Sequence, residues 1–386
     1  MKPAAVAVVG GGVMGASVAW HLAARGVREV VVLDRGAGPG EGSTGKATGG
    51  FRAQYATAIN VRLSLLAREK LLRFRDEVGA DPGYTQAGYL WLAATGKELA
   101  VLRQGREVQH AEGLTEAIEV NADEVGRINP AVRLDGVAGG AFCPTDGFIR
   151  PHAILQGYVD AARRLGVRFE WGTEVTGVER LGRTIAAIRT PHGALATDKV
   201  VNAAGPWAAP LARLAGVELP VSPLRRQVAA TVPCDLLPAA MPMTIWAGDG
   251  FHLRVRDGRV LLLWPTPGVP GRPYDASVDP EWLDGVAAKA HARVPVLRGT
   301  TVDHAASWAG LYEMSPDKHA ILGLAPGCDN LYLINGSSGH GVMHAPALGQ
   351  LLGEIICDGK ATTFDVRALR PGRFAEGELN PVSELL

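Results

Sequence analysis

Two short apolar runs near the amino terminus predict buried β-strands on either side of a helix. Residues 6–9 and 30–33 are rich in valine, and strands that are buried on both faces read as continuous apolar runs of this kind. Between them, residues 16–25 are mostly small and apolar and precede Gly26, which is typical of a helix and its end. We therefore expect a strand–helix–strand unit at the start of the chain.

Similar patterns recur later in the chain. Residues 330–334 are a strand candidate, and the apolar side chains between residues 348 and 356 recur on one stripe of a helix. Further strands are expected at residues 168–176 and 200–207, with an amphipathic helix at residues 154–165 before the first of them. Alternation of strands and helices favours a parallel sheet covered by helices.

A glycine-rich turn joins the first strand to the first helix. The sequence of residues 10–15 is Gly-Gly-Gly-Val-Met-Gly, and the second strand ends at Asp34. Gly10 permits a sharp turn, Gly12 lets the backbone approach a pyrophosphate, and Gly15 permits close packing of the helix. The helix start offers N–H groups to phosphates, and a carboxylate after the second strand can accept hydrogen bonds from both ribose hydroxyls. The pattern predicts dinucleotide binding, with an ordinary strand–helix turn as the alternative.

These patterns predict a mixed fold, α/β in its core and α+β overall. The segments at residues 1–80, 150–220 and 305–386 are expected to form one discontinuous, Rossmann-type dinucleotide-binding domain. Residues 81–149 and 221–304 contain short alternating runs, which suit antiparallel strands. We therefore expect an inserted, antiparallel-sheet substrate domain.

The composition excludes several classes of protein. The chain has 386 residues, of which 47% are hydrophobic, and its 39 basic residues balance its 39 acidic residues. Zero net charge gives no long-range attraction to nucleic acid or to an anionic membrane. The four cysteines are too few and too far apart for a disulfide framework, and no apolar run is long enough to span a membrane. We expect a cytoplasmic protein that binds a small molecule.

A second glycine-rich turn precedes the predicted carboxy-terminal helix. Residues 336–341 read Gly-Ser-Ser-Gly-His-Gly, and the positive end of the following helix can stabilise a group that becomes negative, such as a reduced flavin. A structural turn is the alternative. His340 and His344 are four residues apart, the spacing of two metal ligands on one helix face, but no third ligand accompanies them. We therefore expect no metal site.

Several further motifs, in this order along the chain, resemble those of the D-amino acid oxidase-like family of FAD-dependent amine and amino-acid oxidoreductases. The pattern is most similar to the monomeric and β-subunit sarcosine oxidases and to the β-type proline dehydrogenases. The segments that carry the resemblance, besides the first glycine-rich turn, are Gly42 to Arg52, Asp146 to Pro151, Asn202 to Trp207, Trp308 to Tyr312 with Ser315 to Asp317, and Ser338 to Gly341.

The resemblance implies FAD stretched across the first domain, with its adenine end at Asp34 and its flavin ring between Thr48 to Arg52 and Gly339 to Gly341. The FAD is expected to be non-covalent, because Gly310 stands where the monomeric sarcosine oxidases have a cysteine that carries the flavin. The implied FAD-binding residues are Gly10, Gly12, Val13, Met14, Gly15, Asp34, Arg35, Ser43, Thr44, Thr48, Gly49, Gly50, Val175, Ala204, Gly205, Trp207, Gly310, Gly336, Ser338, Gly339, His340, Gly341 and Val342.

Three side chains are the catalytic candidates. Arg52 matches an arginine that clamps the substrate carboxylate in the sarcosine oxidases, and a guanidinium can hold a carboxylate by two parallel hydrogen bonds. Tyr312 is expected beside the flavin, and His252 lies on an alternating strand and can influence amine protonation. The alternatives are an exposed salt-bridge arginine, a core tyrosine and a structural histidine.

The resemblance also implies the chemistry. A hydride leaves a carbon bonded to nitrogen and goes to flavin N5, which gives an imine that water hydrolyses. The expected substrate is a small amino acid or N-alkyl amino acid, similar to sarcosine, proline or glycine. Two lysines of the oxidases correspond here to the stretch Leu261 to Leu263 and to Met343, which favours transfer of electrons to another protein or a quinone. Two other readings stay open: a non-catalytic or electron-transfer flavin-binding subunit or assembly factor, and a nicotinamide-dependent dehydrogenase.

Overall fold

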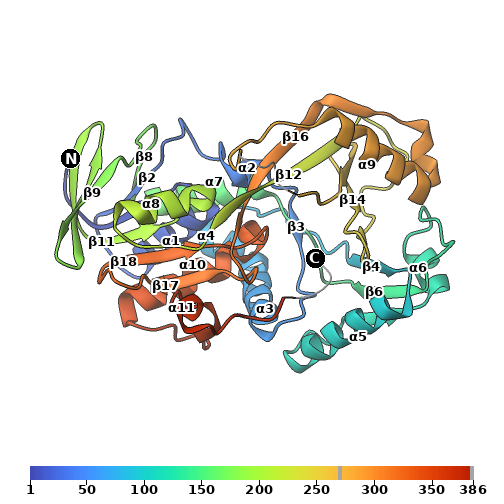
Figure 1. Cartoon of the computed structure of the whole chain (residues 1–386), viewed down its shortest axis with the longest axis horizontal. Coiled ribbons are helices and arrows are strands. Elements are labelled where there is room, and N and C mark those ends of the chain that lie inside the picture. The colour runs from blue at the N-terminus through green and yellow to red at the C-terminus, as the bar shows by residue number, and fades with distance from the viewer. Residues whose placement is uncertain (268–271, 383–386) are drawn as a thin grey trace.

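In the described part of the chain, two eight-stranded sheets and one two-stranded sheet organise the fold (Figure 1). The computed structural model describes residues 1–267 and 272–382. The remaining residues of the predicted domain ranges, 268–271 and 383–386, lie outside the described part of the chain. In Figure 1 the first sheet and its helices occupy one half of the view, and the second sheet occupies the other half.

The first sheet is the Rossmann-type sheet that the sequence predicted. Its strands, in spatial order, are β17 (Ile321–Leu324), β18 (Leu331–Asn335), β11 (Gly193–Asn202), β1 (Ala4–Val9), β2 (Val30–Leu33) and β8 (Arg168–Glu170), and the hairpin of β9 (Gly177–Leu181) and β10 (Thr184–Thr190) extends from β11. The five strands from β18 to β8 pair in parallel, whereas β17 is antiparallel to β18. The carboxyl ends of β1 and β2 therefore lie next to each other.

Helices cover both faces of this sheet, which explains its continuous apolar strands. Alternate side chains of β1 and β2 pack on one face against α1 (Val13–Ala24), α7 (Pro151–Arg164) and α10 (Gly341–Asp358), and on the other against α8 (Ala208–Leu214). The long helix α3 (Ala58–Leu72) packs against α10. Burial on both faces excludes water from the sheet and gives it a rigid edge on which the glycine-rich turn is built.

The second sheet is largely antiparallel. Its strands, in spatial order, are β16 (Val302–Met314), β12 (Ser222–Thr231), β15 (Arg259–Leu263), β14 (His252–Arg256), β13 (Met243–Trp246), β4 (Tyr89–Ala93), β6 (Gly139–Cys143) and β5 (Ile118–Val120). Only the β4–β13 pair among them is parallel in the described residues. The small sheet pairs β3 (Gly50–Phe51) with β7 (Gly147–Phe148).

The remaining helices surround these sheets. Side chains of α9 (Pro280–Arg293) pack on those of β12, β14 and β15. The other helical segments are α2 (Ser43–Lys46), α4 (Phe74–Val78), α5 (Gly96–Ala111), α6 (Ala122–Ile128), α11 (Arg373–Glu376), and the 3₁₀ turns Gly205–Trp207, Pro295–Gly299 and Arg367–Leu369.

Two predicted strands are shorter than expected. The strand predicted at residues 168–176 ends at Glu170, because the N–H groups of Gly172 and Thr173 donate to the loop after β2 rather than to a neighbouring strand. The strand predicted at residues 200–207 ends at Asn202 and is followed by the 3₁₀ turn. The division into domains stays a prediction. Residues 305–314, which that prediction assigns to the dinucleotide-binding domain, belong to β16 and pair in the second sheet.

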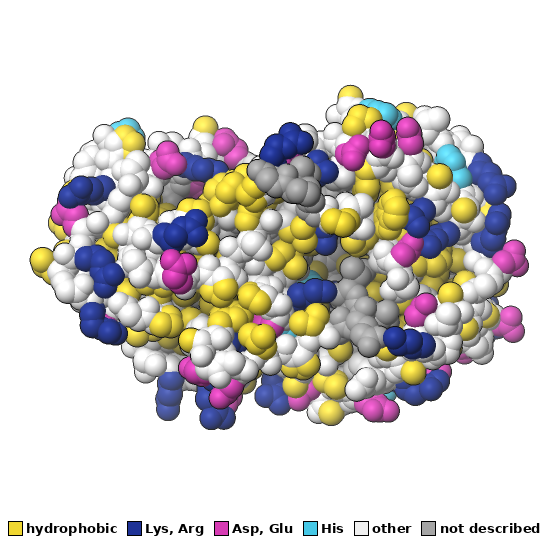
Figure 2. Space-filling view, in the orientation of Figure 1, with side chains coloured by type: hydrophobic (Ala, Val, Ile, Leu, Met, Phe, Trp, Pro, Cys, Tyr) yellow, Lys and Arg dark blue, Asp and Glu magenta, His cyan; other side chains and the backbone are white. Residues whose placement is uncertain are grey.

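The surface carries charges of both signs. Figure 2 shows Lys and Arg side chains alternating with Asp and Glu side chains around one face of the molecule, with apolar side chains between them. Among the described helices, none is long and apolar enough to cross a membrane.

Candidate functional site

One continuous cavity joins the two glycine-rich turns. Its volume is about 890 Å³, within the range of about 300–1,000 Å³ that is common for ligand sites. The first turn contributes residues 10–14 to its lining, and the second contributes residues 337–341 together with the start of α10. Among the candidate site residues, Gly15 and Gly336 are the two that do not line this cavity. The structure therefore brings segments from both ends of the chain to one elongated site, and the roles of these residues stay a prediction.

The first turn is built as the glycine pattern requires. Gly10 has a φ of +108°, and a Cβ on Gly15 would lie 1.9 Å from the Gly10 carbonyl oxygen. Helix α1 begins after Gly12 without a side-chain cap, and the Val13 N–H donates to Thr44 Oγ1 at 3.1 Å. An α-helix cannot pair its first N–H groups internally. Apart from the Val13 N–H, which Thr44 accepts, the N–H groups at this helix start are available to an anionic ligand.

Asp34 organises the loop at the far end of the cavity. Its Oδ2 accepts a hydrogen bond from the Gly11 N–H at 2.6 Å, and its Oδ1 accepts one from the Gly36 N–H at 2.7 Å. Each carboxylate oxygen retains a further lone pair for a ligand hydroxyl. The adjacent Arg35 is exposed, and its guanidinium lies over the Trp207 ring with Cζ 4.1 Å from the ring centre. Arg35 therefore borders the cavity but directs its charge onto an aromatic face.

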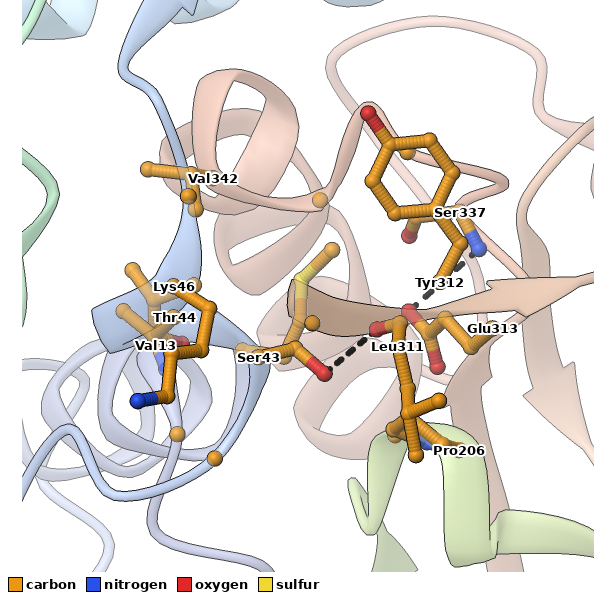
Figure 3. A pocket seen from close by; sticks show the side chains of 18 of the residues that line it. Val13, Ser43, Thr44, Lys46, Pro206, Leu311, Tyr312, Glu313, Ser337 and Val342 are labelled. Carbon is orange, nitrogen blue, oxygen red and sulfur yellow. Dashed lines mark hydrogen bonds between the residues drawn. The ribbon is translucent and has the colours of Figure 1, made fainter. Parts of the chain in front are cut away.

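Helix α2 is fixed against β16 across the cavity. The Ser43 hydroxyl donates to the Leu311 carbonyl at 2.6 Å (Figure 3), and the Trp308 indole N–H donates to the Lys46 carbonyl at 2.8 Å. A Cβ on Gly310 would lie 2.8 Å from Lys46 Cβ, so a glycine is required where the two elements meet. Val175 and Ala204 line the cavity from the first sheet's side.

The segment of residues 47–50 is held by arginines of β14. Arg254 Nη1 donates to the carbonyl oxygens of Thr48 and Gly49 at 2.9 and 3.0 Å, and Arg256 Nη1 donates to the Ala47 carbonyl at 3.2 Å. Arg254 is buried against the Phe148 ring, and this burial lowers its pKa to about 10. The segment is therefore shaped by the second sheet although it follows the first glycine-rich turn in sequence.

Arg52 is buried and oriented on several sides. Its side chain is 7% exposed, and its Cζ lies 4.6 Å from the centre of the Tyr55 ring and 5.0 Å from that of the Trp91 ring. Arg52 Nη2 lies 3.3 Å from His340 Nε2. Burial and the charge of Arg52 hold the pKa of His340 well below its usual range, so His340 is neutral and accepts the hydrogen bond. This burial contradicts the alternative that Arg52 is an exposed residue in a salt bridge.

Asp146 fixes the backbone that follows Arg52. Its carboxylate accepts hydrogen bonds from the Ala53 N–H at 2.7 Å and from Gln54 Nε2 at 3.1 Å. Complete burial raises the pKa of Asp146 to about 7. The aspartate begins one of the motifs that carried the resemblance, and its part in holding the Arg52 segment is not visible from sequence spacing.

Tyr312 and His252 reach the same end of the cavity as Arg52. Tyr312 is 36% exposed and projects from β16 to a different side than Glu313 does (Figure 3). His252 Nδ1 lies 2.8 Å from the Gly250 carbonyl oxygen, to which it donates. Burial, together with the charges of Arg52 and Arg226, lowers the pKa of His252 to about 4. His252 is therefore a neutral imidazole in this cavity at neutral pH.

The hydroxyl of the second turn that was predicted to bind the ligand, that of Ser338, is used in the structure of the turn itself. Ser338 adopts a left-handed backbone with φ of 49°, and its Oγ accepts from the Ser315 N–H at 3.1 Å and donates to the Gly336 carbonyl at 3.0 Å. Helix α10 begins after His340 without a side-chain cap.

The neighbouring His344 bonds to Ser64 through Nε2 at 2.8 Å. In residues 1–267 and 272–382, no three His, Cys, Asp or Glu side chains are grouped to hold a metal ion.

Sequence reasoning missed two charged residues that line this end of the cavity. Arg226 of β12 pairs in register with Gly310 of β16, and no sequence motif signals this pairing. Glu313 accepts a hydrogen bond from the Ser337 N–H at 3.3 Å, and burial raises the pKa of its carboxyl to about 7. Both positions depend on how β16 is paired, which the sequence does not reveal.

Comparison with known proteins gives consistent matches over nearly the whole chain. A family model described as FAD dependent oxidoreductase matches residues 5–355. Mitochondrial dimethylglycine dehydrogenase of Rattus norvegicus is 27% identical over 391 residues, which cover 96% of this chain and 44% of that protein. This chain thus spans less than half the length of that relative.

Two further proteins match over nearly all or all of their length. Glycine oxidase of Geobacillus kaustophilus is 27% identical over 372 residues, which cover 94% of each chain. The crystal structure of L-proline dehydrogenase from P. horikoshii superimposes with a TM-score of 0.91 at 28% identity, covering 98% of this chain and 100% of that one.

Proposed function

The chain belongs to the FAD-dependent oxidoreductase family, and from this premise we propose that it oxidises the carbon–nitrogen bond of a small amino acid or N-alkyl amino acid. FAD is the cofactor, as in that family. The observation that carries the proposal is the convergence of Arg52, Tyr312 and His252 on one end of the cavity whose other end contains the first glycine-rich turn.

The residues of the cavity fit FAD. A helix start without a side-chain cap and an aspartate with unused lone pairs suit a pyrophosphate and a ribose. Gly12, Met14 and Asp34 would hold the nucleotide half, and residues 339–341 would lie at the flavin half. When bound, FAD supplies an acceptor for the hydride that leaves the substrate carbon.

Arg52 would bind the substrate carboxylate. Its guanidinium is buried and oriented by two aromatic rings and a neutral histidine, so little freedom remains to be lost when an acid binds. A carboxylate held by two parallel hydrogen bonds fixes the direction of the neighbouring C–H bond. This fixed direction is what hydride transfer from that carbon requires.

The electrostatics of the cavity favour a neutral substrate amine. An ammonium group cannot release a hydride from its carbon readily, because the nitrogen lone pair must be free to form the imine. Two guanidinium groups and a desolvated environment disfavour a further positive charge. His252 donates through Nδ1 to Gly250, which leaves Nε2 as an acceptor for the amine proton.

The names of the relatives support the same substrate class. Dimethylglycine dehydrogenase, glycine oxidase and L-proline dehydrogenase are each named for an amine that also carries a carboxylate. The electron acceptor is proposed to be a protein or a quinone. Leu263, in the stretch Leu261 to Leu263 that corresponds to one lysine of the oxidases that the sequence resembles, lines the cavity, as does Met343, which corresponds to the other.

An anaerobic panel tests this function. The FAD-loaded protein is mixed with sarcosine, proline, glycine and D-amino acids, and loss of the visible absorbance of oxidised flavin is followed. We expect at least one of these compounds to bleach the flavin, and the colour to return slowly in air and rapidly with an artificial quinone. A fully loaded protein that neither this panel nor the amino dicarboxylic acids tested below bleach would contradict the proposal and favour a non-catalytic flavin-binding subunit.

A further inference from the structure

Arg226 brings a second guanidinium to the part of the cavity that contains Arg52. Its Cζ lies 5.7 Å from the centre of the Tyr312 ring, and its Nη1 donates to the carbonyl oxygens of Thr266 and Arg225 at 2.7 and 3.2 Å. Within residues 1–267 and 272–382, no hydrogen bond uses Nε or Nη2 of Arg226. One side of the guanidinium is therefore anchored, and the other is available to a ligand.

The charge of Arg226 is not balanced by a carboxylate: among the described residues, no Asp or Glu oxygen lies within 4.0 Å of its guanidinium nitrogens. Desolvation lowers the pKa of Arg226, and the acidic group that opposes this shift is the Tyr312 phenol. A partly buried guanidinium without a counter-charge is costly. Such a group is typical of a site that an anionic ligand completes.

Arg52 and Arg226 act on the same part of the cavity from different elements. Both guanidinium groups influence the pKa values of His252 and Tyr312. Glu313, with a pKa of about 7, is partly protonated at neutral pH and is bonded to the Ser337 N–H. A carboxylate bound by Arg52 alone would leave the charge of Arg226 without an anionic partner among the described residues.

We propose that the substrate carries two acidic groups: a carboxylate beside the oxidised carbon, bound by Arg52, and a second carboxylate, on the side chain or on the amine substituent, bound by Arg226. The substrate class is that of amino dicarboxylic acids and N-carboxyalkyl amino acids. The proposal rests on the proposed function and narrows it. It also assigns Arg226 as a specificity-determining residue.

Matched acids and amides test this proposal. The FAD-loaded protein is mixed anaerobically with iminodiacetate and its monoamide, and with glutamate and glutamine of both configurations. Each pair has the same size and differs in one negative charge. We expect the rate of flavin bleaching at low substrate concentration to be at least about tenfold higher for the acid of the preferred pair, as is typical when a desolvated guanidinium meets a carboxylate.

Two variants test whether Arg226 causes the preference for the acid over the amide. Arg226→Gln is expected to abolish the preference for the acid. Arg225→Gln is the matched control, because this neighbouring side chain donates instead to the Ser277 carbonyl at 3.0 Å, and it is expected to keep the preference. A variant Arg226→Gln that loses FAD, or that slows acid and amide equally, would overturn the proposal by assigning Arg226 to the cofactor or to the fold.

Binding without reaction separates this proposal from the proposed function. Titration calorimetry of the FAD-loaded protein with succinate and with succinamate is expected to show tighter binding of succinate, and the difference is expected to disappear in Arg226→Gln. If succinate and succinamate bind equally, the second carboxylate subsite is wrong. If succinate binds tighter but no compound bleaches the flavin, the subsite stands and carbon–nitrogen oxidation is wrong.

Discussion

At the scale of single residues, Arg52 illustrates how a buried charge is held in place. Its guanidinium contacts two aromatic faces, and His340 accepts a hydrogen bond from Nη2 at 3.3 Å. These neighbours suit a planar, delocalised cation and not a compact ammonium group. A lysine at position 52 would therefore keep the positive charge but would not fit these neighbours as the guanidinium does.

Replacement of Arg52 by lysine tests this distinction. Arg52→Lys keeps the positive charge but removes the parallel donors, and we expect kcat/KM to fall by a factor that corresponds to about 2–4 kcal/mol of transition-state binding. FAD content, measured as the absorbance ratio of flavin to protein, is expected to stay as in the wild type. The control is Arg62→Lys, in an exposed ion pair with Glu112. Equal kcat/KM in wild type and Arg52→Lys would remove Arg52 from the substrate site.

Residues that lie within a local motif were accessible from the sequence, whereas residues that depend on strand pairing were not. Asp34 follows a buried strand after a glycine-rich turn, and this local pattern is sufficient to predict its position. Arg226 faces the cavity because β12 pairs with β16 in one register, and such long-range register is not encoded in any short segment. Asp146 lies within one of the sequence motifs, but its hydrogen bonds to residues 53 and 54 are visible only in the folded chain.

At the scale of secondary-structure elements, β14 supports the segment of residues 47–50. Alternate residues of a strand share one face, and Arg254 and Arg256 both direct donors to carbonyl groups of this segment. Gly49 has a φ of +79°, and a Cβ there would lie 2.3 Å from the Ile149 carbonyl oxygen. The segment therefore depends on donors from the second sheet for the shape that it presents to the cavity.

Removal of the Arg254 guanidinium is expected to release this segment. Arg254→Met removes the Arg254 donor from the carbonyl oxygens of Thr48 and Gly49, of which the Gly49 oxygen keeps the Ile149 N–H at 2.9 Å. We expect the free energy of unfolding to fall by about 2–3 kcal/mol, since a hydrogen bond to a charged donor contributes about 1.5–3 kcal/mol and the replacement retains packing. FAD is expected to dissociate faster during gel filtration. Arg256→Met, which removes one donor that is less buried, serves as the control and is expected to have a smaller effect. Equal losses in both variants would contradict this account.

The elements themselves were predicted to different degrees. The strand at residues 30–33 was predicted with its exact bounds, because a continuous apolar run between polar residues admits few other structures. The first helix begins at Val13, three residues before the predicted start, because the second half of the glycine-rich turn already belongs to it. Residues 171–176 were expected to continue a strand, but Gly172 and Thr173 bond to the loop after β2 and Thr176 bonds to Arg189, an outcome decided by tertiary contacts.

At the scale of the whole molecule, the packing of helices on the first sheet buries ionisable side chains. His21 of α1 is 6% exposed and packs against the rings of Trp20 and Tyr158. Its Nε2 has no hydrogen-bond partner among the described residues. Burial lowers the pKa of His21 to about 3, so it stays neutral in the folded state. Neutral burial makes the stability of the whole chain depend on pH.

The sign of this dependence follows from proton binding. The unfolded chain protonates His21 near its ordinary pKa of 6.5, and the folded chain does so only near 3. Stability therefore falls as the pH falls from about 6.5 towards 3. When the pH is lowered from 7.5 to 5.5, we expect the free energy of unfolding of His21→Phe to fall by about 1 kcal/mol less than that of the wild type.

Urea unfolding of the protein with saturating FAD, at both pH values, measures this difference. Asp146 and Glu313 have raised pKa values of about 7 and act in the opposite direction, but both are present in wild type and variant and cancel in the comparison. His304→Gln, at an exposed position, is the control and is expected to follow the wild type. Identical pH dependence in wild type and His21→Phe would contradict the burial argument.

The contact between Gly310 and Lys46 limits how this protein can acquire a permanent link to its cofactor. A Cβ at position 310 would lie 2.8 Å from Lys46 Cβ. Because Lys46 Cβ is bonded directly to the backbone, rotation of the lysine side chain cannot move it away. A thiol introduced there alone would push α2 away from β16 before any bond could form. A variant that binds its flavin covalently through position 310 would therefore need a change at residue 46 before a cysteine replaces Gly310.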